Sequence, residues 1–340
     1  EISPHPILTY AIGDTLNSDQ HRTLETLHRD ADDTVSFHTN LNATFTTAAP
    51  RTDRGPAVPV ELPTTPWHHT RHWVTASRRV QGSSSGPRPG TLLGEHTAVA
   101  TAPAGHLWLA RLVPEGKPYP GFHRFDGVEI VPLSVLLQTL LEAATACGAS
   151  ELRDIALEYP ITVDQPRVIQ VFADDNTITV SSSLSKEAHA QHWVRHVTAR
   201  IVRGASEDPV VAPADTAELS DYDTSTIAAR HREWGVEGNA FVWSIDAARA
   251  GSGRLQAEIS TAGASVALLD AAATIARLAD DTDPRLLIPT AIERLRLHAG
   301  SAGPTGSIDV RRRAGDDFVV DIAVASEAGA LVDVGGLRYA

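Results

Sequence analysis

Two stretches of the sequence carry apolar residues at the spacing of a buried helix. In the first, residues 133–146, the apolar positions are 133, 136, 137, 140, 141 and 144. Steps of three and four residues predict a helix with one broad buried face, and Gly148 is a natural stop for it. The second stretch, residues 266–278, predicts another helix of the same kind.

Short runs with the composition and alternation of strands surround each predicted helix. Around the first they lie at 98–101, 106–112, 161–163, 168–173, 177–181 and 192–202. Around the second they lie at 241–245, 254–259, 292–297, 307–311, 318–324 and 331–337. Because the same order occurs twice, we predict a duplicated α+β unit in which strands wrap one central helix.

The rest of the chain predicts less regular structure. Residues 18–30 look helical and residues 35–38 look like a strand, while 48–63 are rich in Pro, Thr, Arg and Gly and read as a linker. A Gly-, Ser- and Pro-rich break at 81–90 predicts a domain boundary. The Pro- and Asp-rich stretch 206–221 separates the two predicted units.

Charge and composition exclude several classes of partner. With 29 basic and 42 acidic residues the net charge is −13, which argues against nucleic acid or an anionic membrane surface. The one cysteine, Cys147, leaves no internal disulfide framework and fits a reducing compartment. No stretch is long and apolar enough to span a bilayer, and the start lacks the pattern of a signal peptide. We therefore expect a cytoplasmic protein.

His123 is a candidate base for proton transfer. It lies four residues before Gly127, and Pro132 follows directly ahead of the first predicted helix. A neutral imidazole accepts a proton at physiological pH, Gly127 permits a close backbone approach, and Pro132 suits a first helical turn. The N–H of Gly127 or Val128 is then available to polarise a carbonyl oxygen. A single histidine in a turn is more often structural, so this assignment depends on a partner.

Asp270 is that partner, a carboxyl inside the second apolar helix between Leu269 and Ala271. An unpaired carboxylate is costly in such a setting, and desolvation favours its protonated form, which can act as an acid. Thr274 lies one helical turn further on the same face, where its hydroxyl is placed to bond the carboxyl.

These motifs resemble the dehydratase domain of type I polyketide synthases over roughly residues 91–340. The resemblance implies a double hot-dog fold, in which His123 of the first hot-dog is the base and Asp270 of the second is the acid. It also implies substrate contacts from Gly127, Val128, Pro132, Trp234, Gly235 and Thr274. The sequence departs from the family at Thr274, where Gln or His is usual. It departs again at Trp234-Gly235-Val236, where Tyr-Gly-Pro is frequent.

Two earlier segments resemble neighbouring parts of the same synthases. Residues 1–8 are similar to the end of an acyltransferase domain, and residues 62–73 to the linker that follows it. We therefore divide the chain into an acyltransferase tail and linker (1–80), an N-terminal hot-dog (91–205) and a C-terminal hot-dog (218–340). His68, His69 and His72 of the linker lack a cysteine or carboxylate at fitting spacing, so we predict no metal site.

The resemblance implies dehydration of a 3-hydroxyacyl chain on an acyl carrier protein to the trans-2-enoyl thioester. Within the family, the sequence looks most similar to synthases of methyl-branched lipids such as mycocerosic acid synthase. This similarity implies a long acyl chain. No cofactor is expected beyond the carrier's phosphopantetheine. The expected partners are the acyl carrier protein, other domains of the synthase and a second copy of the chain. An enoyl isomerase using the same base, and a silent scaffold for dimerisation and carrier docking, are the alternatives.

Overall fold

The computed structural model describes residues 7–16, 23–44, 86–100, 105–184, 192–204, 219–251, 253–279, 285–315 and 317–340. The chain forms two compact units, Glu1–Trp73 and Val74–Ala340. The predicted boundaries near residues 48–63 and 80 fall outside the described residues, so that division of the chain stays a prediction.

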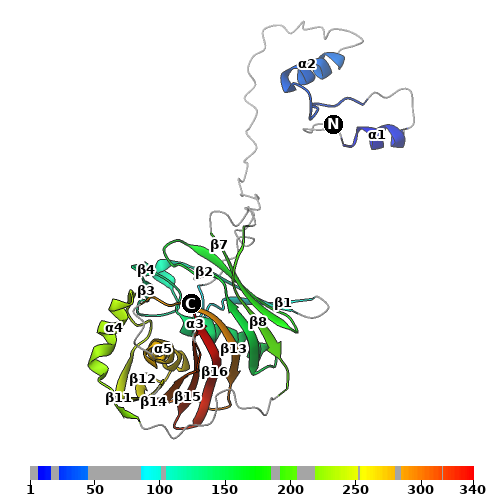
Figure 1. The fold of residues 1–340 in the computed structure, drawn as a ribbon. Coiled ribbons are helices and arrows are strands. Elements are labelled where there is room, and N and C mark those ends of the chain that lie inside the picture. Colours follow the sequence, from blue (N-terminus) through cyan, green and yellow to red (C-terminus); the bar gives the residue numbers. More distant parts are fainter. Residues whose placement is uncertain are drawn as a thin grey trace, which may run out of the picture. The chain divides into compact units, whose positions relative to one another are not determined.

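The first unit holds α1 (Thr9–Leu16) and α2 (Asp33–Ala43) (Figure 1). Two predictions here are wrong. Residues 18–22 of the predicted helix 18–30 lie outside the described residues, and 23–30 form no helix. Residues 35–38, predicted as a strand, lie inside α2. The Asp32 side chain accepts a hydrogen bond from the N–H of Val35 at 3.0 Å. This N-cap starts the helix, and it outweighs the weak strand preference of a short Val- and Phe-containing run.

One antiparallel sheet of thirteen described strands runs through the second unit, in the order β1-β2-β6-β7-β8-β5-β13-β16-β15-β14-β12-β11-β9. Its first half consists of β1 (Glu95–Val99), β2 (Gly105–Leu112), β5 (Glu151–Leu157), β6 (Arg167–Ala173), β7 (Thr177–Leu184) and β8 (Val194–Val202). The second half consists of β9 (Ser220–Asp221), β11 (Trp243–Gly251), β12 (Arg254–Thr261), β13 (Pro289–Leu297), β14 (Thr305–Arg312), β15 (Phe318–Ser326) and β16 (Gly329–Tyr339).

The two halves join where β5 pairs with β13. A buried carboxylate marks this seam: Glu151 of β5 is bonded by Arg294 at 2.8 Å and by Arg296 at 2.7 Å. Burial opposes the charge of Glu151, yet hydrogen bonds from the surrounding arginines lower its pKa to about 2. The seam is therefore an ion-paired strand contact, and it lets the sheet continue from one half into the other.

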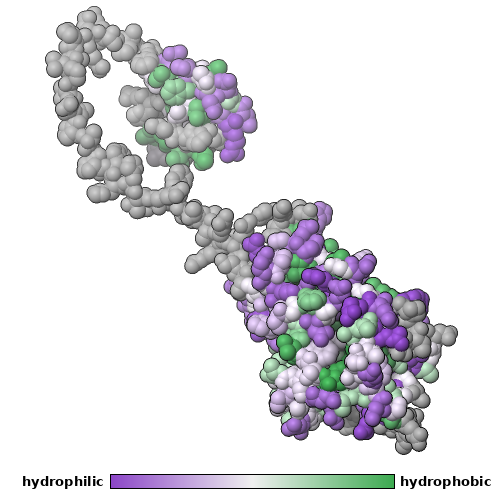
Figure 2. All heavy atoms as spheres, turned by 90° about the vertical axis from the view of Figure 1, so that its left-hand side faces the viewer, coloured by the Kyte–Doolittle hydropathy of each residue, from purple (hydrophilic) through white to green (hydrophobic). Residues whose placement is uncertain are grey.

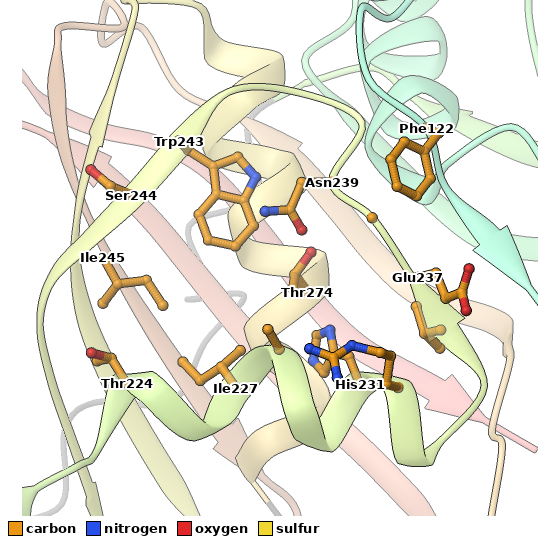
Figure 3. A pocket seen from close by; sticks show the side chains of 14 residues that line it. Phe122, Thr224, Ile227, His231, Glu237, Asn239, Trp243, Ser244, Ile245 and Thr274 are labelled. Atoms are coloured by element: carbon orange, nitrogen blue, oxygen red, sulfur yellow. The ribbon is translucent and has the colours of Figure 1, made fainter.

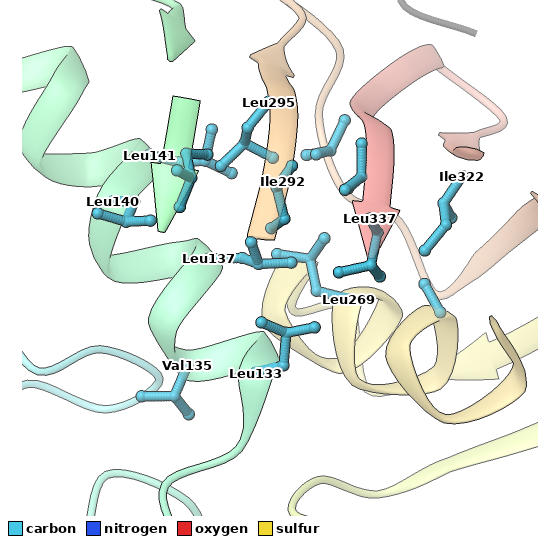
Figure 4. Close-up of a cluster of buried hydrophobic side chains, with 14 of the residues drawn as sticks. Leu133, Val135, Leu137, Leu140, Leu141, Leu269, Ile292, Leu295, Ile322 and Leu337 are labelled. Atoms are coloured by element: carbon cyan, nitrogen blue, oxygen red, sulfur yellow. The ribbon is translucent and has the colours of Figure 1, made fainter. Parts of the chain in front are cut away.

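Each half wraps one central helix, α3 (Leu133–Ala146) in the first and α5 (Ser265–Ala276) in the second. The predicted helices 133–146 and 266–278 are thus confirmed, the second with a short 3-10 extension, Arg277–Ala279. The two helices also contact each other. Figure 4 shows Leu133 and Leu137 of α3 beside Leu269 of α5, and all three are buried. Because each buried leucine contributes roughly 1.5–3 kcal/mol, this shared core fixes one helix against the other. The predicted double hot-dog fold is confirmed.

A small second sheet also links the halves. It has the order β10-β3-β4, with β3 (Arg124–Phe125) and β4 (Val128–Glu129) from the first half and β10 (Val236–Glu237) from the second. Asp126 and Gly127 connect β3 to β4 with positive φ angles of 48° and 79°. Such angles are typical of the two-residue Asp-Gly hairpin turn. The small sheet thus holds His123, which directly precedes β3, against the segment around β10.

The sequence patterns missed several elements and overstated one. They missed α1, β5, the helix α4 (Ile227–Glu233) and the two-residue strands β3, β4, β9 and β10. The predicted strand at 161–163 is a single bridge between Thr162 and Ile130. The other predicted strands of the double hot-dog fall on or within a few residues of observed ones.

Hydrophilic side chains prevail on the face of the second unit that Figure 2 presents, and the hydrophobic ones there are scattered among them. Scattered exposed apolar residues are normal for a folded domain. Among the helices that the structure describes, none has the length and apolar character needed to cross a membrane.

Candidate active site

Two cavities lie around the small sheet and share part of their walls. The inner cavity, of about 70 Å³, is lined by His123, Phe125, Pro132, Leu133, His231, Trp234, Val236, Gly238, Asp270, Ala273, Thr274, Arg277, Leu287, Pro289 and Tyr339. The outer cavity, of about 640 Å³, lies between α4 and the start of β11 (Figure 3). His231, Val236, Gly238 and Thr274 line both, so these four residues form the wall between them.

Five of the eight predicted site residues line the inner cavity: His123, Pro132, Trp234, Asp270 and Thr274. The two predicted catalytic residues therefore lie in one small cavity although they come from different halves of the fold.

The other three predicted residues, Gly127, Val128 and Gly235, are not among the cavity's lining residues. Gly127 belongs to the hairpin turn, and Val128 pairs with Phe125 and is 47% exposed. The Gly235 carbonyl accepts a hydrogen bond from the N–H of Asp126 at 2.8 Å. These residues support the hairpin next to His123 rather than the cavity itself. Pro132 and Leu133, at the start of α3, line the cavity in their place.

The backbone carbonyl of Gly238 lies beside the imidazole of His123 and favours its charged form. A neutral imidazole has one N–H. With that N–H directed at the carbonyl, the other ring nitrogen keeps its lone pair. Burial lowers the pKa of His123, and the nearby Asp270 and Glu129 carboxyls and the Gly238 carbonyl oppose that shift. The result favours a neutral ring, which is the form a base requires.

Asp270 is 4% exposed on α5 and its carboxyl is held by three donors. Oδ1 accepts from the Ser134 hydroxyl at 2.9 Å. Oδ2 accepts from the Trp243 indole N–H at 3.0 Å and from the Phe241 backbone N–H at 3.2 Å. Burial raises the pKa of Asp270, although these three hydrogen bonds and His123 oppose the rise. The predicted protonated acid is consistent with this direction.

The donors also indicate which oxygen of Asp270 carries the proton. Trp243 and the Phe241 N–H can only donate, so Oδ2 must accept from both. The Ser134 hydroxyl can donate or accept, so a proton on Oδ1 is compatible with every contact. In the protonated carboxyl, Oδ1 is therefore the acidic oxygen.

Sequence reasoning missed Ser134, Gly238, His231 and Trp243. For Ser134 the sequence holds a weak signal, namely a hydroxyl residue in the first turn of an apolar helix. A buried hydroxyl needs a polar partner, and Ser134 is fully buried. Trp243 and His231 come from segments whose patterns revealed nothing of the cavity.

The hydrogen bond expected between Thr274 and Asp270 does not form. In the described region the Asp270 carboxyl is bonded by Ser134, Phe241 and Trp243 instead. The Thr274 backbone carbonyl lies beside the His231 ring, and the Thr274 side chain faces the outer cavity in Figure 3. The helical spacing placed Thr274 at the site correctly, but donors from other elements already occupy the carboxyl.

Metal ligands do not gather in the described part of the chain, where no group of three or more His, Cys, Asp or Glu side chains could hold an ion. His68, His69 and His72 lie outside the described residues.

We predict that Gly238→Ala will slow the reaction without unfolding the domain. Gly238 has φ of +80°, and a Cβ there would collide with the ring and carbonyl of Phe122. Relieving the clash must shift the Gly238 carbonyl, which lies beside the His123 ring. We expect kcat to fall by about ten- to a hundredfold, because small misplacements of reacting groups have such effects. Steady-state kinetics and a thermal melt would measure this.

Gly253→Ala is the matched control. Gly253 also has a positive φ, +74°, but an added Cβ would meet only Arg312 at 3.5 Å, an ordinary contact. This variant should lose some stability and keep its kcat. Equal kcat values for the two variants would show that the Gly238 carbonyl does not position the base.

Sequence and structure comparisons give relatives of one kind. Residues 91–191 match the family model "Polyketide synthase dehydratase domain". One chain of the phenolphthiocerol/phthiocerol polyketide synthase of Mycobacterium tuberculosis is 41% identical over 351 residues, which cover 96% of this chain and 18% of the relative. The chain thus spans about a fifth of the length of that relative. The narrower likeness to mycocerosic acid synthase stays a prediction, because this relative bears another name.

Solved structures agree in fold. The dehydratase domain from the CurF module of the curacin polyketide synthase matches with a TM-score of 0.62 at 18% identity, over 75% of this chain and 99% of that one. Two structures described as inactive mutants of the CurK dehydratase each match with a TM-score of 0.60 at 20% identity, over 73% of this chain and 97% and 98% of theirs. One of them carries a His-to-Phe change and the other an Asp-to-Asn change. These structures show the fold, and the family model and the mycobacterial relative show that this chain belongs to the dehydratase domains of polyketide synthases.

Proposed function

We propose that this domain removes water from a 3-hydroxyacyl thioester carried on the phosphopantetheine of an acyl carrier protein, giving the trans-2-enoyl thioester. The observation that carries the proposal is the pairing of His123 and Asp270 in one small cavity, with burial favouring the neutral form of each. A neutral imidazole beside a protonated carboxyl is the state in which one group accepts a proton while the other donates one.

In the proposed reaction His123 removes a proton from C2 of the acyl chain. The electron pair of that C–H bond forms the C2=C3 double bond, and the C3–O bond breaks. Asp270 gives its Oδ1 proton to the departing hydroxyl, which leaves as water. His123 is then protonated and Asp270 ionised, and a net proton transfer from the imidazolium to the carboxylate restores the starting state. Both proton transfers come from side chains, so the proposal needs no cofactor.

The thioester oxygen gains negative charge as the C2 proton leaves. Pro132 and Leu133 line the cavity at the start of α3. The first backbone N–H groups of a helix have no acceptor within it, and the helix dipole favours negative charge at this end. We propose that the first turn of α3 stabilises the thioester oxygen, in place of the predicted N–H of Gly127 or Val128.

Both alternatives from the sequence account less well for Asp270. A silent scaffold has no use for a buried carboxyl whose pKa is raised, because an apolar residue would be less costly there. An isomerase would use the same base and would also need a proton donor, so assays must separate it from a dehydratase. The CurK variants, described as inactive with a His-to-Phe or an Asp-to-Asn change, support the same pair of residue types in that dehydratase.

The substrate and partners belong to the same proposal. The phthiocerol synthase relative supports a long lipid-type acyl chain, and the outer cavity of about 640 Å³ offers room for part of that chain or for the pantetheine arm. We propose the acyl carrier protein, other domains of the synthase and a second copy of the chain as partners. We also propose that the protein is cytoplasmic.

The test is mass spectrometry of a 3-hydroxyacyl pantetheine thioester incubated with the protein. Loss of one water, with a product that matches a trans-2-enoyl standard, is the expected result. Incubation of the 2-enoyl thioester alone should give hydration back to the 3-hydroxyacyl form. Formation of a 3-enoyl product without any exchange of water would favour the isomerase, and no reaction of either substrate would favour the scaffold.

A further inference from the structure

His231 is a second imidazole at the proposed reaction site. It lies on α4 and lines both the inner and the outer cavity. Figure 3 shows its side chain projecting from α4 toward Thr274 of α5. His231 is near enough to His123 that a charge on one ring would disfavour a charge on the other. The proposed mechanism gives this residue no part, although it lines the same small cavity as His123 and Asp270.

The hydrogen bonds of His231 define what its ring can still do. The Thr274 backbone carbonyl lies beside the ring and favours its charged form, while Nε2 is buried and has no hydrogen-bond partner among the residues that the structure describes. Nδ1 is the nitrogen left to face this carbonyl, so we assign the single N–H of the neutral ring to Nδ1. Burial lowers the pKa of His231 to about 4, so the ring is neutral at physiological pH. Nε2 is consequently an acceptor with a free lone pair.

A buried acceptor without a donor is unfavourable, so Nε2 is suited to a ligand that donates a hydrogen bond. The proposed substrate has few donors. Its thioester group has none, and neither does the double bond of the product. The 3-hydroxyl is the donor at the reacting carbons, and it can donate its proton to Nε2 while a lone pair of the same oxygen accepts from Asp270.

We propose that His231 Nε2 accepts a hydrogen bond from the 3-hydroxyl of the substrate and so selects 3-hydroxyacyl chains. This inference rests on the proposed function and adds a substrate-recognising residue to it. When the C3–O bond breaks and Asp270 supplies the second proton, the departing water keeps its hydrogen bond to Nε2. A chain without the hydroxyl would leave Nε2 unsatisfied and would bind more weakly.

Two variants separate this role from a structural one. In His231→Asn the amide N–H can replace Nδ1–H and keep the bond to the Thr274 carbonyl, but nothing stands in the place of Nε2. In His231→Gln the longer side chain can bring its amide oxygen near the position of Nε2 as an acceptor. If His231 only supported Thr274, the asparagine variant would be the milder change. If Nε2 binds the hydroxyl, the glutamine variant is the milder one.

The experiment compares binding of 3-hydroxyacyl and saturated acyl pantetheine thioesters of equal chain length by calorimetry. It uses the full chain carrying Asp270→Asn, so that the hydroxyacyl ligand is not consumed. With His231 present we expect about tenfold tighter binding of the hydroxyacyl ligand, the effect of one hydrogen bond. His231→Asn should reduce the preference to less than twofold, and His231→Gln should retain most of it. An unchanged preference in His231→Asn would overturn the proposal.

A second measurement needs no change at His231. In protein with nitrogen-15-labelled histidines, the Nε2 resonance of His231 should move upfield when the hydroxyacyl ligand binds and stay in place with the saturated one. An Nε2 resonance at the same position with both ligands would also overturn the proposal. Both measurements report ligand binding and not turnover. A protein that binds hydroxyacyl chains through His231 but never releases water would therefore refute the proposed function and leave this inference standing.

Discussion

Replacing His123 with phenylalanine is expected to abolish water elimination while leaving the double hot-dog folded. The imidazole is the proposed base, and the loss of a general base costs about a hundred- to ten-thousandfold in rate. Phenylalanine fills similar space but accepts no proton. Folding should survive because His123 lies at the cavity wall before β3, and the hairpin is held by other contacts, such as that between Asp126 N–H and the Gly235 carbonyl at 2.8 Å. His123→Ala should be equally inactive.

Two readouts make this prediction specific to the base. Exchange of the C2 proton with deuterated water reports removal of that proton, and it should disappear together with elimination in His123→Phe. His106→Phe is the matched control, because His106 lies on β2 and stacks on Trp108 with ring centroids 5.7 Å apart, away from the cavity lining. That variant should keep the turnover of the unaltered protein. Near-native turnover in His123→Ala would refute the assignment of the base.

Asp270→Asn is expected to have the second-largest effect, a loss of about a hundredfold or more in elimination with the fold preserved. The side-chain amide fits the same contacts. Its oxygen can accept from Trp243 and from the Phe241 N–H, and its NH₂ can donate to the Ser134 hydroxyl, which accepts as well as donates. What is lost is the proton on Oδ1. Exchange at C2 should be less affected than elimination, because His123 remains.

The pH dependence of the rate follows from the two pKa shifts. Activity requires neutral His123, and since burial lowers its pKa, the acid limb should lie below the ordinary range of an imidazole. Activity also requires protonated Asp270, and since burial raises its pKa, the alkaline limb should lie above the ordinary range of a carboxyl. The alkaline limb should vanish in Asp270→Asn. An unchanged alkaline limb would show that another group supplies the proton.

Stability should change with pH in a way that identifies the same carboxyl. The folded-state pKa of Asp270 is raised above its unfolded value. Its ionisation therefore destabilises the fold as pH rises through the interval between these two values. Asp270→Asn should accordingly be at least as stable as the unaltered protein above that interval.

Asp309→Asn is the control, because Arg254 and Arg311 bind Asp309 at 2.8 and 2.6 Å. Although burial opposes it, their hydrogen bonds lower the pKa of Asp309. The ionised form of Asp309 therefore stabilises the fold above the unfolded pKa, and this contribution is lost as pH falls. Asp309→Asn should be less stable at neutral pH and fully active. Denaturant titrations across pH would compare the two variants.

Two elements of the fold could not be predicted from the sequence because their reasons lie in distant partners. The strand β5 contains Glu151, Arg153 and Asp154, and these charges conceal a strand pattern. Glu151 is buried there because Arg294 and Arg296 of β13 neutralise it. The helix α4 is short and polar, and it packs against the small sheet through contacts with β10. Neither arrangement leaves a periodic signal in its own segment.

Local patterns sufficed for α3, α5 and the strands that bury alternate side chains, because helical and strand periodicities act over a few neighbouring residues. The same kind of reasoning selected His123 and Asp270, since an imidazole before a turn and a carboxyl on an apolar helix are unusual in their own surroundings. The partners of these groups were decided by tertiary structure alone. Ser134 reaches Asp270 across 136 residues of sequence. The Gly238 carbonyl and the His231 ring reach the cavity because β10 pairs with β3. Such contacts depend on how two halves of the chain pack together, and packing over that separation has no period that a sequence could display.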